Sequence, residues 1–327
     1  LFGLCIAHQR HSLPGGCPGG HLAVAQAQAD VVLSVGLREE SVFLQGAPTS
    51  VPDVEKSPSD LSPALHSNTS PLTSKNLGIG YRERGRTTVV GEGISFSLPA
   101  GTLNAVVGIN GAGKSTLLKT LAGMHPALSG SVLLRGVPLE ERTPAQRAHL
   151  LSVVLTEPLA SKNLRVEDLV GLGRHPYTNW LGQLDEEDRR QVQDALNKME
   201  LKAMASKPCH TLSDGQLQRA MVARALAQDT PLMLLDEPTT HLDLYHKVKI
   251  LKLLREVAHS TGKSILFSTH EIGLAIQLCD HILVLHQGQA RFGTPCDLIE
   301  AGEFQKLFPG DTIAFDPQSG VFRVQKD

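Results

Sequence analysis

One glycine-rich stretch constrains the fold of this chain more than any other feature. Leu103 to Gly123 reads LNAVVGINGAGKSTLLKTLAG, an apolar run followed by a turn rich in glycine and then by a helical pattern of leucines. Glycines allow consecutive backbone N–H groups to curl around an anion, and the following helix N-terminus adds a partial positive charge. The stretch predicts a strand, an anion-binding loop and a helix.

The loop also carries the two side chains that a triphosphate site needs. Gly108 to Ser115 matches the pattern G-x-x-x-x-G-K-[ST], with Lys114 placed to reach the outer phosphates and the Ser115 hydroxyl available to Mg²⁺. A turn that served only to join strand and helix would need neither side chain. We therefore predict a nucleoside triphosphate site, with contacts from Asn110, Gly111, Ala112, Gly113, Lys114, Ser115 and Thr116.

Composition and charge restrict the class of protein and its partners. The chain has 327 residues, of which 41% are hydrophobic and 20% charged, so it can bury a substantial core. The formal net charge is −2 and lysines and arginines form no run, which argues against nucleic acid as a partner. No window approaches the roughly 18 to 20 apolar residues of a membrane-spanning helix. Work at a membrane would then require docking on subunits that span it.

Composition also indicates the redox state of the cysteines and which part of the chain is expected to be disordered. The five cysteines are spread widely without C-x-x-C spacing, which predicts neither a disulfide framework nor a zinc site and favours a reducing cytosol. Prolines alternate with serines and threonines from 46 to 74, a composition that buries too little apolar surface to offset its ordering entropy. We expect residues 1–74 to be a disordered extension or linker. His11, Cys17 and His21 within it match no metal template.

The folded part is expected to begin with two half-buried antiparallel strands. Apolar residues alternate from Leu77 to Tyr81, and again from Ile94 to Leu98. Tyr81 ends the first of these predicted strands. An exposed aromatic ring just before a phosphate-binding unit can stack on a purine, or it can simply pack at the strand end, and the sequence alone leaves both interpretations open.

Further along, the pattern indicates an α/β fold with a helical insertion. Strands are predicted at 131–135, at 150–155 as a buried parallel strand, at 232–235 as a central strand, at 264–268, and at 282–285 as an edge strand. Helices are predicted from Thr143-Pro144, with the threonine as N-cap, after the segment 212–216 through Gln228, and with Leu244, Val248 and Leu251 on one face. Between 157 and 208 strands give way to helices, one of which starts with the acids 185–188 and buries Val192, Ala195, Leu196 and Met199.

Polar residues follow two of the predicted apolar strands. Asp236 and Glu237 end the strand 232–235, and His270 ends the strand 264–268. Because parallel strands present their carboxyl ends at one edge of the sheet, these side chains should emerge beside the phosphate loop. Asp236 can hold Mg²⁺ through water, Glu237 can orient or deprotonate an attacking water, and His270 can contact the γ-phosphate. Together they predict triphosphate hydrolysis.

Five motifs in order resemble those of ATP-binding cassette ATPases. They are GINGAGKST from Gly108, LSDGQ from Leu212, LLDEP from Leu234, TTHLD from Thr239, and His270. The resemblance spans about residues 75–308, leaving 309–327 as a tail. It implies an α/β P-loop NTPase (RecA-like) core with an antiparallel β subdomain and an inserted helical subdomain at about 157–210. Tyr81 then falls at the position of the family's adenine-stacking aromatic.

The resemblance also implies a head-to-tail dimer that binds two ATP. Ser213 and Gly215 of one copy would cap the ATP held by Lys114 and Ser115 of the other, and Gln216 and Asp243 belong to the same implied contact set. The physical sense is that a second helix N-terminus completes the anion cage.

Two positions depart from the family pattern. Asp214 stands where the family usually has glycine, and its side chain can cap the following helix. Glu157, or Thr156 in another register, stands where the family carries a glutamine that ligates Mg²⁺ and senses the membrane partner. A carboxylate can bind Mg²⁺, although its charge disfavours the nearby γ-phosphate.

A finer resemblance concerns the substrate. The segment VEDLVGLGRHPY from Val166 to Tyr177 resembles importers of iron–siderophore, haem or cobalamin complexes. It implies permease subunits as partners, a periplasmic binding protein indirectly, and a place on the cytoplasmic face of the bacterial inner membrane. A soluble regulatory or repair ATPase is the alternative. The repair type would need a long coiled coil between Thr116 and Leu212, where no heptad pattern is sustained. An ATP sensor without turnover would be expected to lack Glu237.

Overall fold

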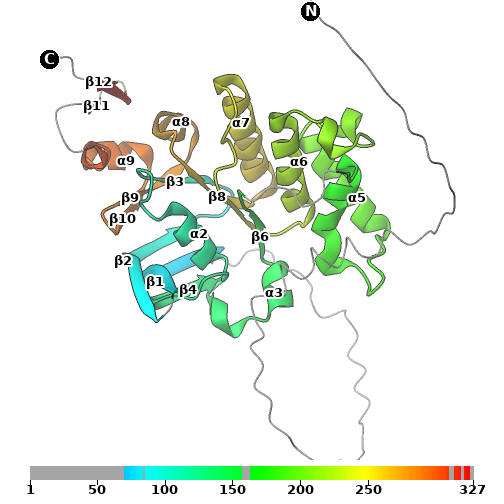
Figure 1. The fold of residues 1–327 in the computed structure, drawn as a ribbon, viewed down its shortest axis with the longest axis horizontal. Coiled ribbons are helices and arrows are strands. Elements are labelled where there is room, and N and C mark those ends of the chain that lie inside the picture. The colour runs from blue at the N-terminus through cyan, green and yellow to red at the C-terminus, as the bar shows by residue number, and fades with distance from the viewer. Residues whose placement is uncertain (1–69, 84, 157–162, 309–312, 318–319, 325–327) are drawn as a thin grey trace, which may run out of the picture. The chain divides into compact units, whose positions relative to one another are not determined.

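Parallel strands rich in apolar residues form the central sheet of this protein. The computed structural model describes residues 70–83, 85–156, 163–308, 313–317 and 320–324. Within them the central sheet has the strand order β10-β9-β3-β8-β7-β6 (Figure 1). Its strands are β3 (Leu103–Val107), β6 (Leu151–Val154), β7 (Leu232–Leu235), β8 (Ser264–Thr269), β9 (His281–His286) and β10 (Gln289–Gly293).

The sequence predicted the buried strands correctly, but it predicted an edge position for the strand 282–285, which is wrong. Every residue of β3, β7 and β8 is buried, as their mainly apolar sequences predict for parallel strands covered on both faces. The predicted edge strand 282–285 lies instead between β3 and β10, inside β9. The reason is that the chain turns back after Gln287 and Gly288, and the returning antiparallel strand β10 takes the edge position.

An antiparallel sheet of order β2-β1-β4-β5 lies on one side of the central sheet. Its strands are β1 (Leu72–Glu83), β2 (Arg86–Leu98), β4 (Ser129–Leu134) and β5 (Val137–Pro138). The antiparallel pairing of β1 with β2 confirms the two predicted strands. Tyr81 is not the last residue of its strand, because it pairs with Thr88 and the ladder continues for two more residues.

The faces of the central sheet point into two apolar cores. On one side Val106, Leu234 and Leu266 pack with the inner face of the antiparallel sheet and with helix α2 (Lys114–Leu121). On the other side Ala105, Leu235 and Phe267 pack with the helical layer. This layer includes α6 (Asp214–Ala227), α7 (Leu244–Thr261) and α8 (Ile272–Leu278). The predicted apolar face of α7 was partly wrong, because Leu244 is 66% exposed in the first turn and the buried face begins at Ile250.

The helical insertion is present between β6 and β7. Its elements are α4 (Val166–Gly171), the 3₁₀ helix η3 (Leu172–Tyr177) and α5 (Glu186–Lys198), which pack against α6. Asp185 caps α5 by accepting a hydrogen bond from the Asp188 N–H at 2.7 Å. Val192, Ala195, Leu196 and Met199 are buried, which confirms the predicted face of this helix.

The remaining short elements join these layers and end the described chain. They are η2 (Leu139–Glu141), α3 (Pro144–Ala148), η4 (Lys202–Met204), η5 (Cys209–Thr211), α9 (Pro295–Glu300), η6 (Gln305–Leu307), β11 (Ile313–Asp316) and β12 (Val321–Val324). Thr143 caps α3, as predicted, by accepting a hydrogen bond from the Gln146 N–H at 3.2 Å.

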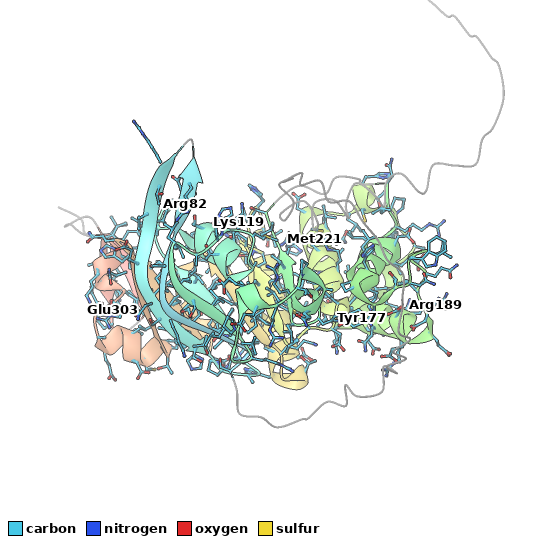
Figure 2. The ribbon with its side chains drawn as sticks, turned by 90° about the horizontal axis from the view of Figure 1, so that it is seen from below. Arg82, Lys119, Tyr177, Arg189, Met221 and Glu303 are labelled. Atoms are coloured by element: carbon cyan, nitrogen blue, oxygen red, sulfur yellow. The ribbon has the colours of Figure 1, made fainter. Side chains whose placement is uncertain are left out.

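A buried ion pair ties η3 to α5 and α6. The Arg174 Nε donates to Asp188 Oδ1 at 2.8 Å, and the Arg174 Nη1 donates to the Ala227 carbonyl at 2.9 Å. Both charged side chains are nearly inaccessible, at 6% and 3% exposure. The Arg174 guanidinium also lies 3.8 Å from the centroid of the Tyr177 ring, whose position in Figure 2 is beside the helical layer. A buried charge that keeps its partners is tolerated, and one that loses them is costly.

We expect Asp188→Ala to lower the free energy of unfolding by about 3–5 kcal/mol, because it leaves the Arg174 charge buried without a carboxylate. Urea denaturation followed by circular dichroism would measure the change. The control is Glu187→Ala at the next position, where the ion pair with Arg190 is exposed and its loss should leave the midpoint nearly unchanged. Equal midpoints for the two variants would contradict this account.

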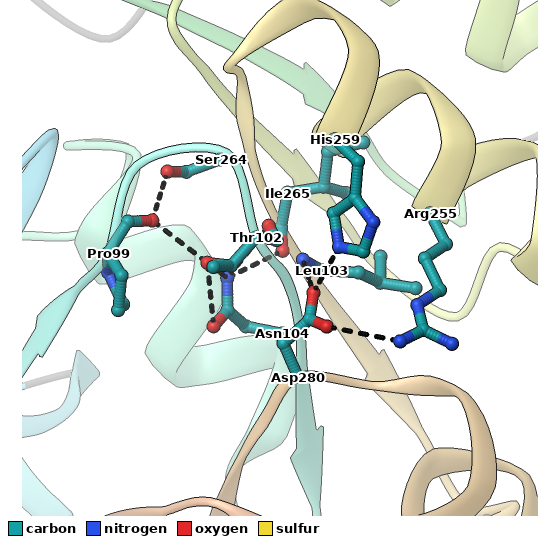
Figure 3. A network of polar contacts seen from close by, with 9 residues as sticks. All are labelled: Pro99, Thr102, Leu103, Asn104, Arg255, His259, Ser264, Ile265 and Asp280. Carbon is teal, nitrogen blue, oxygen red and sulfur yellow. Dashed lines mark hydrogen bonds and ion pairs between the residues drawn. The ribbon is translucent and has the colours of Figure 1, made fainter.

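A polar network anchors the start of β3 (Figure 3). Asp280 Oδ2 accepts from the Leu103 N–H at 2.8 Å and lies 2.9 Å from the His259 Nε2, while its Oδ1 lies 3.5 Å from an Arg255 nitrogen. Asn104 extends the network by donating to the Ile265 carbonyl at 3.1 Å. Burial raises the pKa of Asp280, but the hydrogen bonds from His259 and Leu103 outweigh it and leave the pKa below its ordinary value.

A carboxyl whose pKa is lowered by folding stabilises the protein above its unfolded pKa, and this contribution is lost as pH falls through the folded pKa. Asp280→Asn should therefore lower the urea midpoint at neutral pH, with a difference from wild type that shrinks in acid. The same substitution at the exposed Asp194 should have little effect at either pH. If the midpoint difference between Asp280→Asn and wild type did not change with pH, the lowered pKa of Asp280 would not be the source of the stabilisation.

Candidate functional site

The phosphate loop has the backbone geometry that its glycines were expected to allow. It runs from the end of β3 to the first residue of α2, and Gly111 and Gly113 adopt φ angles of 82° and 96°. A Cβ on Gly113 would lie 2.3 Å from the Val90 Cγ1, and one on Gly108 would lie 2.6 Å from the Leu285 carbonyl oxygen. Side chains at these positions would collide with β2 and β9, so only glycine allows the loop to follow this path around an anion cradle.

Lys114 places a positive charge inside this cradle. Its side chain folds over the loop, and its Nζ donates to the carbonyl oxygens of Gly108 at 2.9 Å and Ile109 at 3.2 Å. The residue is only 6% exposed. Burial lowers the pKa of Lys114, while the nearby Glu237 and Asp236 raise it in part. The ammonium group thus faces two acidic residues from the other strand end.

Asp236 joins the phosphate loop to two other strands. It follows β7 and is 3% exposed, and its Oδ1 accepts from the Ser115 Oγ at 3.0 Å and from the Ser268 Oγ at 2.6 Å. A hydroxyl beside a carboxylate is a set of hard oxygen donors, so Ser115 and Asp236 fit a bound Mg²⁺. Ser268 was not predicted, although a serine within an otherwise apolar strand was a signal that it has a polar partner.

Glu237 has a strained backbone conformation, and hydrogen bonds fix both its backbone and its side chain. Its φ of 45° lies in the left-handed region, which non-glycine residues adopt rarely and often at functional sites. Its N–H donates to the Ser268 Oγ at 2.8 Å, and its Oε2 accepts from the Thr240 Oγ1 at 2.8 Å. The other carboxylate oxygen, Oε1, lies 4.0 Å from the Nδ1 of His270. Thr240 is a further contact that the sequence analysis did not identify.

The predicted residues therefore meet at the carboxyl ends of adjacent parallel strands. Ser115 follows β3, Asp236 and Glu237 follow β7, and His270 follows β8, and these three strands are neighbours in the sheet. The pairings Val107 with Thr269 and Leu235 with Phe267 bring the strand ends to the same level. A carboxylate beside a half-exposed imidazole and a phosphate loop is the arrangement expected for hydrolysis of a phosphoanhydride.

The LSDGQ motif begins helix α6, and its cap differs from the expectation. Ser213 is the N-cap: its Oγ accepts from the Gln216 N–H at 3.3 Å, and its own N–H donates to the Gln216 Oε1 at 3.0 Å. Asp214, which was expected to cap, is the exposed first residue of the helix. Serine takes the position because it precedes the helix with an extended backbone, and Asp214 then adds favourable negative charge to the first turn.

This motif belongs to a different part of the chain from the phosphate loop. The phosphate loop precedes α2, whereas LSDGQ begins α6. An added Cβ on Gly215 would lie 3.5 Å from Leu242 and His246, so the start of α6 contacts the start of α7. Asp243 caps α7, accepting from the His246 N–H at 2.9 Å and lying 2.8 Å from the His246 Nδ1. The nucleotide contacts of Ser213, Gly215, Gln216 and Asp243 stay predictions.

Other sequence predictions fall partly inside and partly outside the described residues. Tyr81 is 42% exposed on β1, and its stacking on adenine stays a prediction. Glu157, the expected metal ligand, lies outside the described residues, as do residues 1–69 of the expected extension. None of the helices in the described ranges is both long enough and apolar enough to cross a membrane.

Comparisons with known proteins identify the family and the fold. The family described as ABC transporter matches residues 92–240. An achromobactin transport ATP-binding protein of Dickeya dadantii is 38% identical over 248 residues, which are 75% of this chain and 91% of that protein. An iron(3+)-hydroxamate import ATP-binding protein of Bacillus subtilis is 35% identical over 250 residues, 76% of this chain and 91% of that protein.

Solved structures agree with the sequence relatives. The structure of cbiO1 from Clostridium perfringens, part of the ABC transporter complex cbiONQ, aligns with a TM-score of 0.63 at 28% identity, over 72% of this chain and 93% of that one. A dimeric post-hydrolysis state of the cassette MJ0796 bound to ADP and Pi aligns with a TM-score of 0.59 at 25% identity, over 68% and 98%. The P-loop NTPase fold and the resemblance stated above are confirmed. This chain belongs to the ATP-binding subunits of the ABC transporter family, which bind and hydrolyse ATP.

Proposed function

We propose that this protein is the ATP-hydrolysing subunit of an importer for iron–siderophore or a similar metal chelate. The observation that carries the hydrolytic part is the meeting of Ser115, Asp236, Glu237 and His270 beside the glycine cradle. The transport part is supported by the two relatives, which are named for achromobactin transport and for iron(3+)-hydroxamate import. A soluble regulatory or repair ATPase is not favoured by these relatives.

Each residue has a chemical role in this proposal. The loop N–H groups and Lys114 bind the phosphates, since both present positive charge within the cradle. Ser115 and Asp236 would hold Mg²⁺, which neutralises charge on the phosphates when bound. Glu237 accepts the proton of the attacking water, because Thr240 and Ser268 fix its side chain and backbone. His270, whose Nδ1 lies 4.0 Å from Glu237 Oε1, would contact the γ-phosphate.

The active unit is a dimer of this chain with head-to-tail pairing. One chain carries one phosphate loop and one LSDGQ motif, so the head-to-tail pairing implied by the resemblance requires a second copy. The related cassette was solved as a dimer bound to ADP and Pi, which supports this pairing. The two helix N-termini then face the triphosphate from opposite sides.

Uptake of a chelate requires a path across a membrane. We place the dimer on the cytoplasmic face of the inner membrane, bound to permease subunits, with a periplasmic binding protein acting indirectly. Relatives named for achromobactin, iron(3+)-hydroxamate and ferric enterobactin support iron–siderophore complexes, and a cobalamin import protein is 33% identical over 71% of this chain. Haem and cobalamin belong to the same proposed chelate class.

Removing the proposed base should separate binding from turnover. Glu237→Gln should leave the affinity for ATP unchanged, lower the rate of ATP hydrolysis by about 10²- to 10⁴-fold and trap the ATP-bound dimer. Phosphate release, fluorescent nucleotide titration and light scattering measure these three properties. Glu256→Gln, at an exposed position of α7, is the matched control. Wild-type turnover in the Glu237 variant would exclude this residue as the base.

Transport can be tested with the permease encoded beside this chain. We expect the reconstituted complex in proteoliposomes to take up a ⁵⁵Fe-hydroxamate complex only with ATP and the matching binding protein. Uptake should be lost with Glu237→Gln and kept with Glu256→Gln. ATP hydrolysis that drives no uptake of iron–siderophore, haem or cobalamin would leave the enzyme assignment intact and refute the proposed substrate class.

A further inference from the structure

The imidazole of His270 lies between two carboxylates, and only one of them belongs to the proposed base. Its Nδ1 is 4.0 Å from Glu237 Oε1, and its Nε2 is 3.5 Å from Glu271 Oε1. His270 is half-exposed, so neighbouring side chains have to determine the plane of its ring. Glu271 approaches the ring edge opposite Glu237, which makes it the residue best placed to orient the ring.

Glu271 is itself held in place from two directions. Its N–H donates to the Thr269 Oγ1 at 3.0 Å, and its carbonyl accepts from the Ala275 N–H at 3.1 Å, at the start of α8. The same Oε1 that faces His270 forms an ion pair with the Lys247 Nζ. The Lys247 side chain is only 16% exposed, and that of Glu271 is 31% exposed. The carboxylate is therefore fixed by the backbone and by a largely buried cation.

Lys247 comes from the turn of α7 that follows the TTHLD motif. Its N–H donates to the Asp243 carbonyl at 3.0 Å, so it belongs to the first turn of the helix that Asp243 caps. The contact with Glu271 thus joins α7 to the loop between β8 and α8. It also has an electrostatic consequence, because an unpaired carboxylate near the phosphate site would repel ATP. The Lys247 charge offsets that of Glu271.

We propose that Glu271 and Lys247 form a positioning pair, in which Glu271 orients the His270 ring so that Nδ1 faces Glu237, and Lys247 fixes Glu271 and balances its charge. This proposal rests on the hydrolytic roles proposed for Glu237 and His270. Neither residue of the pair touches the reacting atoms. The pair acts on the rate of hydrolysis through His270, and its effect on ATP binding is small as long as the two charges compensate.

The test is the steady-state ATP hydrolysis of the full chain. We expect Glu271→Ala to lower kcat about 10-fold while KM for ATP changes by less than about twofold, since the ring is misoriented but the cradle is intact. Glu271→Gln, which keeps an oxygen acceptor of the same size, should restore part of the rate. Lys247→Met should also lower kcat, and Lys247→Arg should restore it.

A double-mutant cycle distinguishes positioning from a general structural effect. In a His270→Ala background, Glu271→Ala should cause no further loss, because the group through which it acts is already absent. An equal loss in both backgrounds, a change in KM alone, or unchanged kcat for Glu271→Ala would each overturn the proposal. If Glu271→Ala does not fold, as judged by its thermal unfolding, the same cycle with Glu271→Gln and Lys247→Met decides the matter.

The chain offers a matched control at the opposite end of the same strand. Lys263 precedes β8, its side chain is 12% exposed, and its Nζ donates to Asp229 Oδ1 at 2.6 Å and to the Thr230 carbonyl at 3.1 Å. Lys263→Met removes a similar half-buried ion pair far along the strand from His270 and should leave kcat unchanged.

Turnover that survives Glu237→Gln would refute the proposed base. Loss of turnover in that variant with unchanged kcat in the Glu271 variants would refute the positioning pair alone.

Discussion

The hydrogen bonds of Asp236 are the constraint on which the rest of the site depends. A nearly inaccessible carboxylate must find donors, and here these are the hydroxyls of Ser115 and Ser268. Ser115 lies in the first turn of α2, after the phosphate loop that follows β3, and Ser268 lies in β8. The two bonds therefore require β3, β7 and β8 to stay parallel and in register. A slip of one residue would turn Ser268 to the opposite face of its strand. The same strand register therefore determines both the packing of the sheet and the geometry of the site.

Much of the fold could be predicted because it is encoded locally. Mainly apolar runs mark β3, β7 and β8, and acids before an amphipathic pattern mark α5. The errors arose where a long-range partner decides the outcome. Whether 282–285 forms an edge depends on the strand that pairs with it, and the exposure of Leu244 depends on where α7 meets the core. The cap of α6 was missed for a local reason, since two neighbouring polar residues competed for it.

The site shows the same division between local and long-range information. Lys114, Ser115, Asp236, Glu237 and His270 could be identified because each belongs to a motif or ends an apolar strand. Thr240 and Ser268 hold Glu237 from three and thirty-one residues away, and Lys247 reaches Glu271 across twenty-four residues. Contacts of this kind follow from the folded arrangement of strands and helices. A polar residue in an apolar strand, as at Ser268, is the kind of signal that sequence analysis can add.

The first turn of α7 connects the two halves of the proposed mechanism. Through His246 it contacts Gly215 of the LSDGQ motif, which in the proposed dimer faces the nucleotide of the partner subunit. Through Lys247 it holds Glu271 and hence the side of His270 that faces away from Glu237. In the proposed dimer, consecutive residues of one helical turn would therefore contact the cap for one ATP and the residues proposed to hydrolyse the other.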